Sequence, residues 1–347
     1  MKPLRLGTLR ALSAAAMTTI LALPALAQQP AQNAATLDAI RSRGSLTCGV
    51  NTGLAGFAQP DSQGRWQGFD VEYCRALAVA LFNDANKVRY VPTTAKNRFT
   101  ALQSGEIDVL PRNTTATLSR DTSLGLDFPA TNFYDGQGFM VKASLGVSSA
   151  KELDGATVCV QPGTTTEKNL ADFFRASNMK LNPVVIESVE EIRNAMIGGR
   201  CDAFTVGTST LAAFRAGLGD RARDFVVLPE LISKEPLGPV VRKGDDRFYD
   251  VVRWTQNVLH LGEEFGITRQ TLDAAMQDTR PDVQRLLGQS GDFGTMLGLS
   301  PDWAVRILRA VGNYAEIWER HVAPMGLPRG KNQLHTAGGL QYSPPIR

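Results

Sequence analysis

The chain has 347 residues, with 37 basic and 34 acidic side chains, and 43% of its residues are hydrophobic. Three basic residues and no acidic ones lie in the first 27 residues, so the remainder carries 34 residues of each sign. A nucleic-acid or anionic membrane partner usually requires an excess of Lys and Arg. The balanced charge therefore argues against both classes of partner.

The first 27 residues have the pattern of a secretory signal peptide. Lys2, Arg5 and Arg10 precede an apolar run over 11–23, and the segment ends on the A-x-A sequence 25–27. The apolar run is short for a membrane span, and no later segment supplies about 20 consecutive apolar residues. We therefore expect a cleaved signal peptide (1–27), export to the periplasm and no direct membrane insertion. The Gln- and Ala-rich residues 28–36 are expected to be disordered.

The first half of the mature chain alternates strand and helix patterns. "LTCGVN" (46–51) is typical of a strand, and "PDSQGRWQG" (60–68) of a turn-rich hairpin or loop. Asp70 is placed to cap the helix that follows, whose apolar residues recur at helical spacing. The next expected elements, in order, are a strand at 88–91, a helix at 98–104 and a strand at 107–110.

The second half repeats this alternation, which is the pattern of α/β domains with mostly parallel sheets flanked by helices. Two of its helices open with capping boxes, Thr164-x-x-Glu167 and Ser188-x-x-Glu191. Long helical segments follow at 246–265 and 301–321. The other expected elements are strands at 156–160, 184–187, 202–206 and 225–228, and a helix that begins at Thr208.

Two extended, glycine-containing segments lie between the halves, "YDGQGFMV" (134–141) and "SKEPLGPVV" (233–241). If the second returns the chain to the first sheet, residues 138–237 form an inserted lobe. The other lobe then consists of residues 37–137 and 238–347, the latter with C-terminal helices and a tail. The two extended segments would act as hinge strands.

The cysteine count is even, and in an oxidising compartment this favours disulfides. Four cysteines permit three pairings. Because they form two clusters, one in each half, we favour Cys48 with Cys74 and Cys159 with Cys201. A nucleophilic cysteine would need a basic neighbour, and the three histidines are far away in sequence.

Three junctions between a strand and a helix carry Thr or Ser: "VLPRNTTATLSR" (109–120), "VCVQPGTTTE" (158–167) and "FTVGTST" (204–210). Ligands of open α/β sheets bind beyond the carboxyl ends of the strands, where helix starts offer free N–H groups. One such threonine is more often only a helix cap. Three junctions together with Arg120, whose guanidinium can bind a carboxylate, suggest that two lobes bind one anionic group. A surface ion pair with Asp121 or a helix-end contact explains Arg120 equally well.

The chain offers little for catalysis. It has no H-x-x-x-H or C-x-x-C motif and no G-x-S-x-G elbow, so we expect no metal and no cofactor. We also expect no Glu, His or Lys beside the Thr and Arg cluster, which argues against an enzyme.

Several blocks resemble the periplasmic general amino-acid-binding components of ABC uptake systems, in the polar-amino-acid branch of type II solute-binding proteins. They include "TALQSGEIDVLPRNTTATLSRDTSLGLDF", "YDGQGFMV", "DGATVCVQPGTTTE", "SKEPLGP" and "VGNYAEIWER". The resemblance runs from about residue 37 to 347. It implies a type II periplasmic binding fold that closes on an amino acid and docks on a membrane permease as a monomer.

The resemblance also implies roles for particular residues. Arg120 and Thr115 match residues that hold the ligand α-carboxylate, with Asn113 contributing backbone or amide contacts. Thr164 and Thr165 match the second lobe's contacts to the same group. Three further positions concern the ligand side chain, with Asn51 as a polar contact and Leu54 and Phe57 as walls, although packing explains Phe57 equally well.

One position departs from the family pattern. Gly207, followed by Thr208, stands where related proteins have an aspartate that binds the ligand α-ammonium, and enclosing an ammonium without a counter-charge costs several kcal/mol. Either another acid or several carbonyls meet the ammonium, the ligand lacks one, or the site is wetter and weaker. We therefore expect capture of an amino acid or related small carboxylate for an ABC permease. The alternatives are a dehydratase-like periplasmic enzyme of the same fold and a sensor that docks on a membrane receptor.

Overall fold

The computed structural model describes residues 35–347. The predicted signal peptide (1–27) and residues 28–34 lie outside this range. Helix α1 (Ala35–Arg43) contains Ala35 and Thr36, so these two residues are helical and not disordered as expected. The backbone N–H of Thr36 donates to Asp245 (2.7 Å), 209 residues further along the chain, which fixes the start of α1.

Short strands and helices alternate along the chain, as the sequence predicts for an α/β protein. The other helices are α2 (Phe69–Phe82), α3 (Arg98–Gln103), α4 (Leu118–Ser123), α5 (Thr165–Ala176), α6 (Val189–Gly198), α7 (Thr208–Ala216), α8 (Asp246–Glu264), α9 (Leu272–Ala275), α10 (Pro281–Leu286), α11 (Phe293–Met296), α12 (Trp303–Val311) and α13 (Tyr314–His321). The 3-10 turns are η1 (Ala143–Leu145), η2 (Ala150–Glu152), η3 (Gly219–Asp224), η4 (Ala323–Met325), η5 (Gly330–Asn332) and η6 (His335–Ala337). The strands are β1 (Leu46–Asn51), β2 (Gln59–Pro60), β3 (Trp66–Gln67), β4 (Val88–Thr93), β5 (Leu126–Asp127), β6 (Phe133–Asp135), β7 (Gln137–Lys142), β8 (Thr157–Val160), β9 (Asn182–Val185), β10 (Ala203–Gly207), β11 (Phe225–Val227), β12 (Glu235–Leu237) and β13 (Val241–Arg242).

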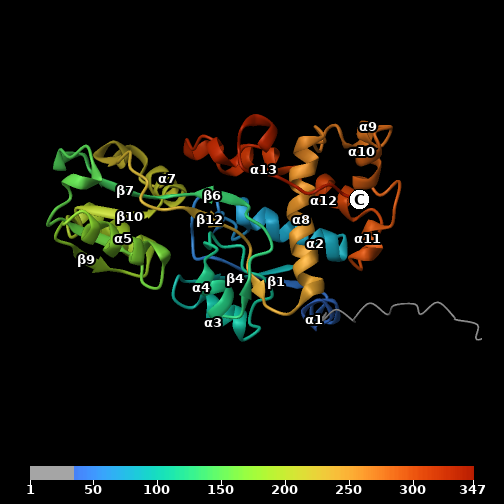
Figure 1. Ribbon diagram of the computed structural model, residues 1–347, viewed down its shortest axis with the longest axis horizontal. Helices are drawn as coiled ribbons and strands as arrows, with labels where there is room; N and C mark the ends of the chain where they lie inside the picture. The colour runs from blue at the N-terminus through green and yellow to red at the C-terminus, as the bar shows by residue number, and fades with distance from the viewer. Residues whose placement is uncertain (1–34) are drawn as a thin grey trace, which may run out of the picture. The chain divides into compact units, whose positions relative to one another are not determined.

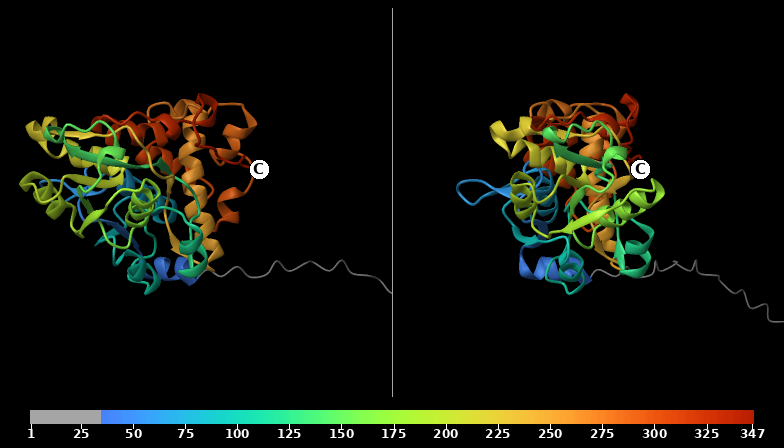
Figure 2. Two further views of the ribbon diagram at one scale, coloured as in Figure 1. Left: turned by 60° about the vertical axis from the view of Figure 1, so that its left-hand side comes forward. Right: turned by 90° about the vertical axis from the view of Figure 1, so that its left-hand side faces the viewer.

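Strand β1 is the centre of the first core. It pairs in parallel with β4, and all six of its residues are buried, as expected for a parallel strand covered on both faces. The predicted strand at 107–110 is reduced to single bridges, from Val109 to Cys48 and from Leu110 to Val240. Helices α8 and α12 pack on α2, which contacts β1. Figure 2 shows the chain from α8 onward, orange to red, lying together.

Strands β7 to β11 form one five-stranded sheet, here called the large sheet, in the order β11-β7-β10-β8-β9. β10, β8 and β9 are parallel, whereas β7 is antiparallel to both β10 and β11. Along β7, Met140 belongs to one hydrophobic cluster and Phe139 and Val141 to another. This is the two-residue period of a strand with a core on each face. The expected α/β fold class is confirmed, with a mixed large sheet.

The chain enters and leaves the large sheet through β6 and β12, here called the crossing strands. They pair antiparallel, with Asp135 directly opposite Glu235. Figure 1 shows the two strands side by side where the chain passes to and from the large sheet. Like charges opposite each other destabilise a strand pair. Each of these carboxylates therefore needs other groups that stabilise it.

Two helix boundaries differ from the sequence prediction. Asp70 is not the cap of α2, because Gly68 (φ 130°) holds that position and Asp70 lies buried inside the first turn. The helical segment predicted at 301–321 is two helices, since Gly312 (φ 80°) ends α12 and Asn313 begins α13 with a capping box. In both cases a glycine in a backbone region that L-residues rarely adopt sets the boundary.

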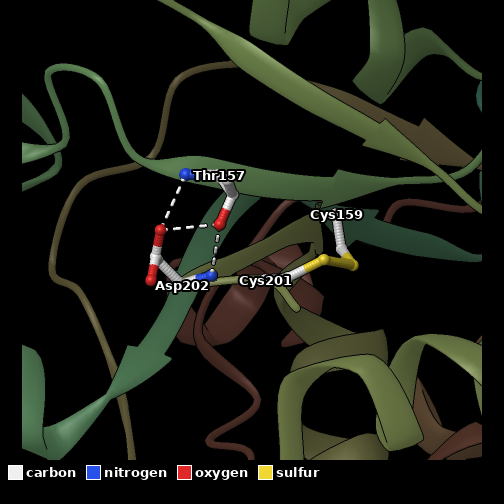
Figure 3. The surroundings of a disulfide bond; sticks show 4 residues. All are labelled: Thr157, Cys159, Cys201 and Asp202. Atoms are coloured by element: carbon white, nitrogen blue, oxygen red, sulfur yellow. Dashed lines mark hydrogen bonds between the residues drawn. A yellow bond between two sulfur atoms is a disulfide. The ribbon is translucent and has the colours of Figure 1, made fainter. Parts of the chain in front are cut away.

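The predicted disulfides are confirmed. Cys48 is bonded to Cys74, which joins β1 to α2, and Cys159 is bonded to Cys201, which joins β8 to the turn before β10. Figure 3 shows the second bond beside hydrogen bonds between Thr157 and Asp202, in which the Asp202 carboxylate accepts from the Thr157 N–H (2.8 Å) and hydroxyl (2.6 Å). A covalent link and a polar link therefore fix the same two neighbouring segments.

Candidate functional site

One cavity collects most of the residues that the sequence analysis singled out. It receives residues from the first core, from the crossing strands and from the large sheet with its helices. The predicted ligand-binding residues that line it are Asn51, Asn113, Thr115, Thr164, Thr165 and Gly207. The other lining residues are Ala95, Arg98, Arg112, Asp135, Gln161, Thr166, Val189, Val206, Thr210, Glu235 and Leu237.

At the start of α5, the hydroxyls of Thr164 and Thr165 have different partners. The Thr164 hydroxyl caps the helix by accepting from the N–H of Glu167 (3.0 Å). The Glu167 carboxylate accepts from the N–H of Gly163 (2.8 Å) and not from that of Thr164, so the predicted capping box is half formed. The Thr165 hydroxyl is left to face the Thr115 hydroxyl, 3.4 Å away.

Glu235 occupies the position between these two threonines. Its carboxylate, on a residue only 3% exposed, accepts hydrogen bonds from the hydroxyls of Thr115 and Thr165, the latter at 2.9 Å. Asn169 (3.0 Å) and Ser233 (2.8 Å) donate to it as well. The expectation that no Glu lies beside the Thr and Arg cluster is therefore wrong. The hydroxyls predicted to hold a ligand carboxylate hold a carboxylate of the protein.

Asp135 is the second acidic residue of the cavity. Its Oδ1 accepts from the Thr208 hydroxyl (2.6 Å) and from the N–H of Gly136 (2.8 Å). Its Oδ2 accepts from the hydroxyl of Ser209, at 2.5 Å. Burial raises the pKa of this carboxyl above its ordinary value of 3.8, and the hydroxyl donors oppose that shift. A β-carbon at position 207 would lie 2.5 Å from Oδ2.

Two arginines bring positive charge to the same cavity. Arg112 donates from Nε to the carbonyl of Thr93 (2.9 Å), and burial lowers its pKa to about 10 although Asp70 opposes the shift. Arg98 is 4% exposed, and its side chain makes no hydrogen bond or ion pair with any of residues 35–347. Burial, and then the like charges of Arg112 and Arg120, hold the pKa of Arg98 well below its usual value.

Arg120, predicted as the carboxylate ligand, lies beside this cavity. It is buried, and it donates from Nη1 to the carbonyl of Thr115 (2.7 Å). Its guanidinium also stacks on Phe99, with 5.0 Å between the guanidinium carbon and the ring centre. Burial lowers its pKa to about 10, with Glu235 opposing. It lines a neighbouring pocket together with Thr164 and Thr165.

The remaining predicted residues take different positions. Leu54 and Phe57 are 2% and 1% exposed in the first hydrophobic core, where Phe57 packs edge-on against other aromatic rings. Neither lines the cavity. Thr208 contacts the cavity only through its hydrogen bond to Asp135. The Asn113 amide lies between Asn51 and Thr210, at 3.4 Å from each.

The sequence did not predict four charged residues of the cavity, namely the acidic pair Asp135 and Glu235 and the arginines Arg98 and Arg112. The only available signal for the acids was that each extended crossing segment carries one acidic residue next to a glycine or proline. For Arg98 the sequence shows an ordinary helix start, and its burial depends on contacts distant in sequence.

The described residues contain no group of three or more His, Cys, Asp or Glu side chains that could hold a metal ion. Within the same range, no helix is both long and apolar enough to cross a membrane. The residues that line the cavity present hydroxyl, amide, guanidinium and carboxylate groups, which together can bind a small molecule that carries charge.

An α/β fold with two crossing strands and a polar, charged cavity beside them defines a binding protein for small solutes. Residues 46–265 match the family of bacterial extracellular solute-binding proteins, family 3. The chain belongs to this family, which confirms the resemblance found in its sequence.

Named relatives cover nearly the whole chain. It is 51% identical to the general L-amino acid-binding periplasmic protein AapJ of Rhizobium johnstonii, over 97% of this chain and 98% of the relative. It is 55% identical to the glutamate/glutamine/aspartate/asparagine-binding protein BztA of Rhodobacter capsulatus, over 91% and 95%. Among solved structures, a periplasmic binding protein from Brucella ovis with glutathione bound is 54% identical, with a TM-score of 0.87 over 90% of this chain and 99% of that one.

Proposed function

We propose that this protein captures an α-amino acid, or a small peptide with a free α-amino acid end, in the periplasm and presents it to the permease of an ABC importer. The observation that carries the proposal is Arg98, a guanidinium buried in a polar cavity that forms no ion pair and no side-chain hydrogen bond with any described residue. A buried charge without a partner is costly, and a ligand carboxylate would compensate it.

The relatives support an amino-acid ligand by their names. AapJ is named for general L-amino acids and BztA for four acidic and amide amino acids. Glutathione, bound in the Brucella ovis protein, carries an α-ammonium and an α-carboxylate at its glutamyl end. These compounds share one headgroup. We therefore infer that the cavity recognises this headgroup and leaves space for different side chains.

The proposal assigns the donors as follows. Arg98 and the hydroxyls of Thr115 and Thr165 bind the ligand carboxylate, with Asn113 beside them. Arg120 holds Thr115 in position through its carbonyl. Glu235 then competes with the ligand for the two hydroxyls, so a bound carboxylate has to share or replace its hydrogen bonds.

We further propose that residues 37–137 and 238–347 form one lobe, that residues 138–237 form the other, and that the crossing strands are the hinge. Thr115 belongs to the first lobe and Thr165 to the second. Their hydroxyls meet one carboxylate only when the lobes are closed. The ligand would thus favour the closed state through contacts that exist only in that state.

The alternative of a dehydratase-like enzyme gains one argument from Glu235, because a carboxyl group lies in the cavity beside hydroxyl donors. It is tested by incubating the pure protein with prephenate and following product formation by absorbance. Product formed at a rate that depends on Glu235 would favour the enzyme.

The proposed function is tested by isothermal titration of the purified mature protein with the common L-amino acids, glutathione, and the 2-oxo acids that correspond to them. We expect at least one compound with an α-ammonium to bind more tightly than its 2-oxo counterpart. The proposal fails if no such compound binds, or if the 2-oxo acids are preferred throughout.

A further inference from the structure

The carboxylate of Asp135, on a half-buried residue that lines the cavity, is a negative charge without a cation among residues 35–347. Its partners are the hydroxyls of Thr208 and Ser209 and the backbone N–H groups of Gly136 and Ser209, all of which are neutral. It forms no ion pair with any of residues 35–347, although Arg98 and Arg112 line the same cavity. Neutral donors orient the carboxylate but leave its charge uncompensated.

Glu235 differs in this respect. Its carboxylate interacts electrostatically with the guanidinium groups of both Arg98 and Arg120. Thr115, Thr165, Asn169 and Ser233 also donate to it. Of the two acidic residues in the cavity, Glu235 is therefore close to positive charge. The charge of Asp135 is not compensated by a cation among the described residues.

Position 207 explains how the Asp135 carboxylate fits. Gly207 has φ −53° and ψ 140°, which any residue can adopt, so its backbone does not require glycine. A β-carbon there would lie 2.5 Å from Asp135 Oδ2 and 3.3 Å from its carboxyl carbon. The glycine is therefore needed for space, and the space is filled by the carboxylate of Asp135.

We propose that Asp135, from a crossing strand, binds the α-ammonium group of the ligand, and that Gly207 is glycine because a side chain there would displace this carboxylate. The assignment rests on the proposed function. It adds that the ligand carries a positive charge as well as the carboxylate that Arg98 binds. The aspartate expected at 207 is absent from the end of β10 because its carboxylate is supplied from β6, which pairs with β12 outside the large sheet. A metal ion is a poor occupant, because the described residues offer no three-ligand group around Asp135.

The test compares Asp135→Asn with the wild-type protein by isothermal titration. The ammonium-bearing probes are L-glutamate, L-glutamine, L-alanine and glutathione, and 2-oxoglutarate is the probe without an ammonium. We expect the variant to bind the ammonium-bearing probes about 100-fold more weakly, as for loss of one partner of a buried charge pair. Its affinity for 2-oxoglutarate should stay the same or increase.

Three further variants separate this role from folding. Gly207→Ala keeps Asp135 but crowds its carboxylate. This variant should also bind the ammonium-bearing probes selectively more weakly, by about tenfold or more. Gly198→Ala is the matched control, because a β-carbon at Gly198 meets no atom within 4 Å. Glu235→Gln should keep the preference for ammonium over 2-oxo ligands.

The outcomes distinguish the two proposals. Wild-type protein that binds neither glutathione nor any of the common L-amino acids contradicts the proposed function and, with it, this assignment. Wild-type binding that is retained undiminished in Asp135→Asn overturns the assignment of Asp135 alone. An equal loss of all probes, with a lower melting temperature, would show a structural role and overturn it too. Loss of ammonium preference in Glu235→Gln, and not in Asp135→Asn, would transfer the role to Glu235.

Discussion

Replacing Arg98 by methionine should stabilise the protein without ligand and at the same time remove ligand binding. The guanidinium is buried, makes no ion pair or side-chain hydrogen bond with residues 35–347, and lies near the like charges of Arg112 and Arg120. Among the residues that the structure describes, Glu235 is the opposite charge that raises the pKa of Arg98. Methionine has a similar unbranched shape and carries no charge.

The expected gain follows from two opposing contributions. Replacing a buried ion pair by apolar side chains of similar volume is often neutral or stabilising by about 1 to 4 kcal/mol, and we apply the same range to this buried arginine, which has no ion pair with residues 35–347. The substitution also removes the contact of the guanidinium with the Phe99 ring, 4.8 Å from its centre, which is worth about 1 kcal/mol. The net expectation is a free energy of unfolding higher by about 0 to 3 kcal/mol.

The assay is urea denaturation of the unliganded proteins, followed by circular dichroism, with Arg309→Met as the control. Arg309 is an exposed arginine in a surface ion pair with Asp273, so its replacement should change stability by no more than about 0.5 kcal/mol. Ligand binding is measured in parallel as the shift of the melting temperature with L-glutamate or glutathione, which Arg98→Met should lose. A variant that is less stable than wild type, or that keeps the shift, refutes the reasoning.

Three other predictions concern stability. Replacing Cys159 and Cys201 together by alanine should lower the free energy of unfolding by about 4 kcal/mol, from the closure entropy of their loop, and calorimetry with and without reductant checks this. Burial lowers the pKa of His260 from its ordinary value of 6.5 to about 3. The neutral imidazole of the folded protein therefore contributes stability that is fully present above pH 6.5 and is lost as the pH falls from 6.5 toward 3. The loss should reach about 2 kcal/mol at pH 5 and vanish in His260→Gln, as seen by urea denaturation at each pH. Gly312→Ala should lower the melting temperature, because the positive φ of Gly312 disfavours any other residue and a β-carbon there would lie 2.5 Å from Glu316. A melting temperature within about 1 °C of wild type would contradict this.

Local patterns predicted much of the fold. Strands such as β1 and β8 are apolar runs between turn residues, and their bounds follow from the few residues around them. The cysteine pairs were predictable because each pair lies within one half of the chain. The threonines of the cavity were visible because helix starts favour hydroxyl side chains, whatever else those side chains contact.

The charged residues of the cavity could not be predicted in the same way. Whether Asp135 or Glu235 points inward depends on the register of β6 against β12, and a shift of one residue would turn each side chain to the other face. The same holds for Arg98, whose helix start looks like a solvent-exposed one. In each case the side chain's environment is made by residues distant in sequence.

The register of the crossing strands links ligand charge to the proposed hinge. Asp135 and Glu235 are opposite each other, and their repulsion opposes the pairing of β6 with β12. A ligand whose ammonium meets Asp135 cancels one of the two charges, and so stabilises the strand pair in the same step in which it is bound. A ligand without an ammonium leaves the repulsion in place. The Asp135 carboxylate would then both select ligands that carry an ammonium and stabilise the closed hinge. This double role is a reason for the carboxylate to lie on a crossing strand and not at residue 207.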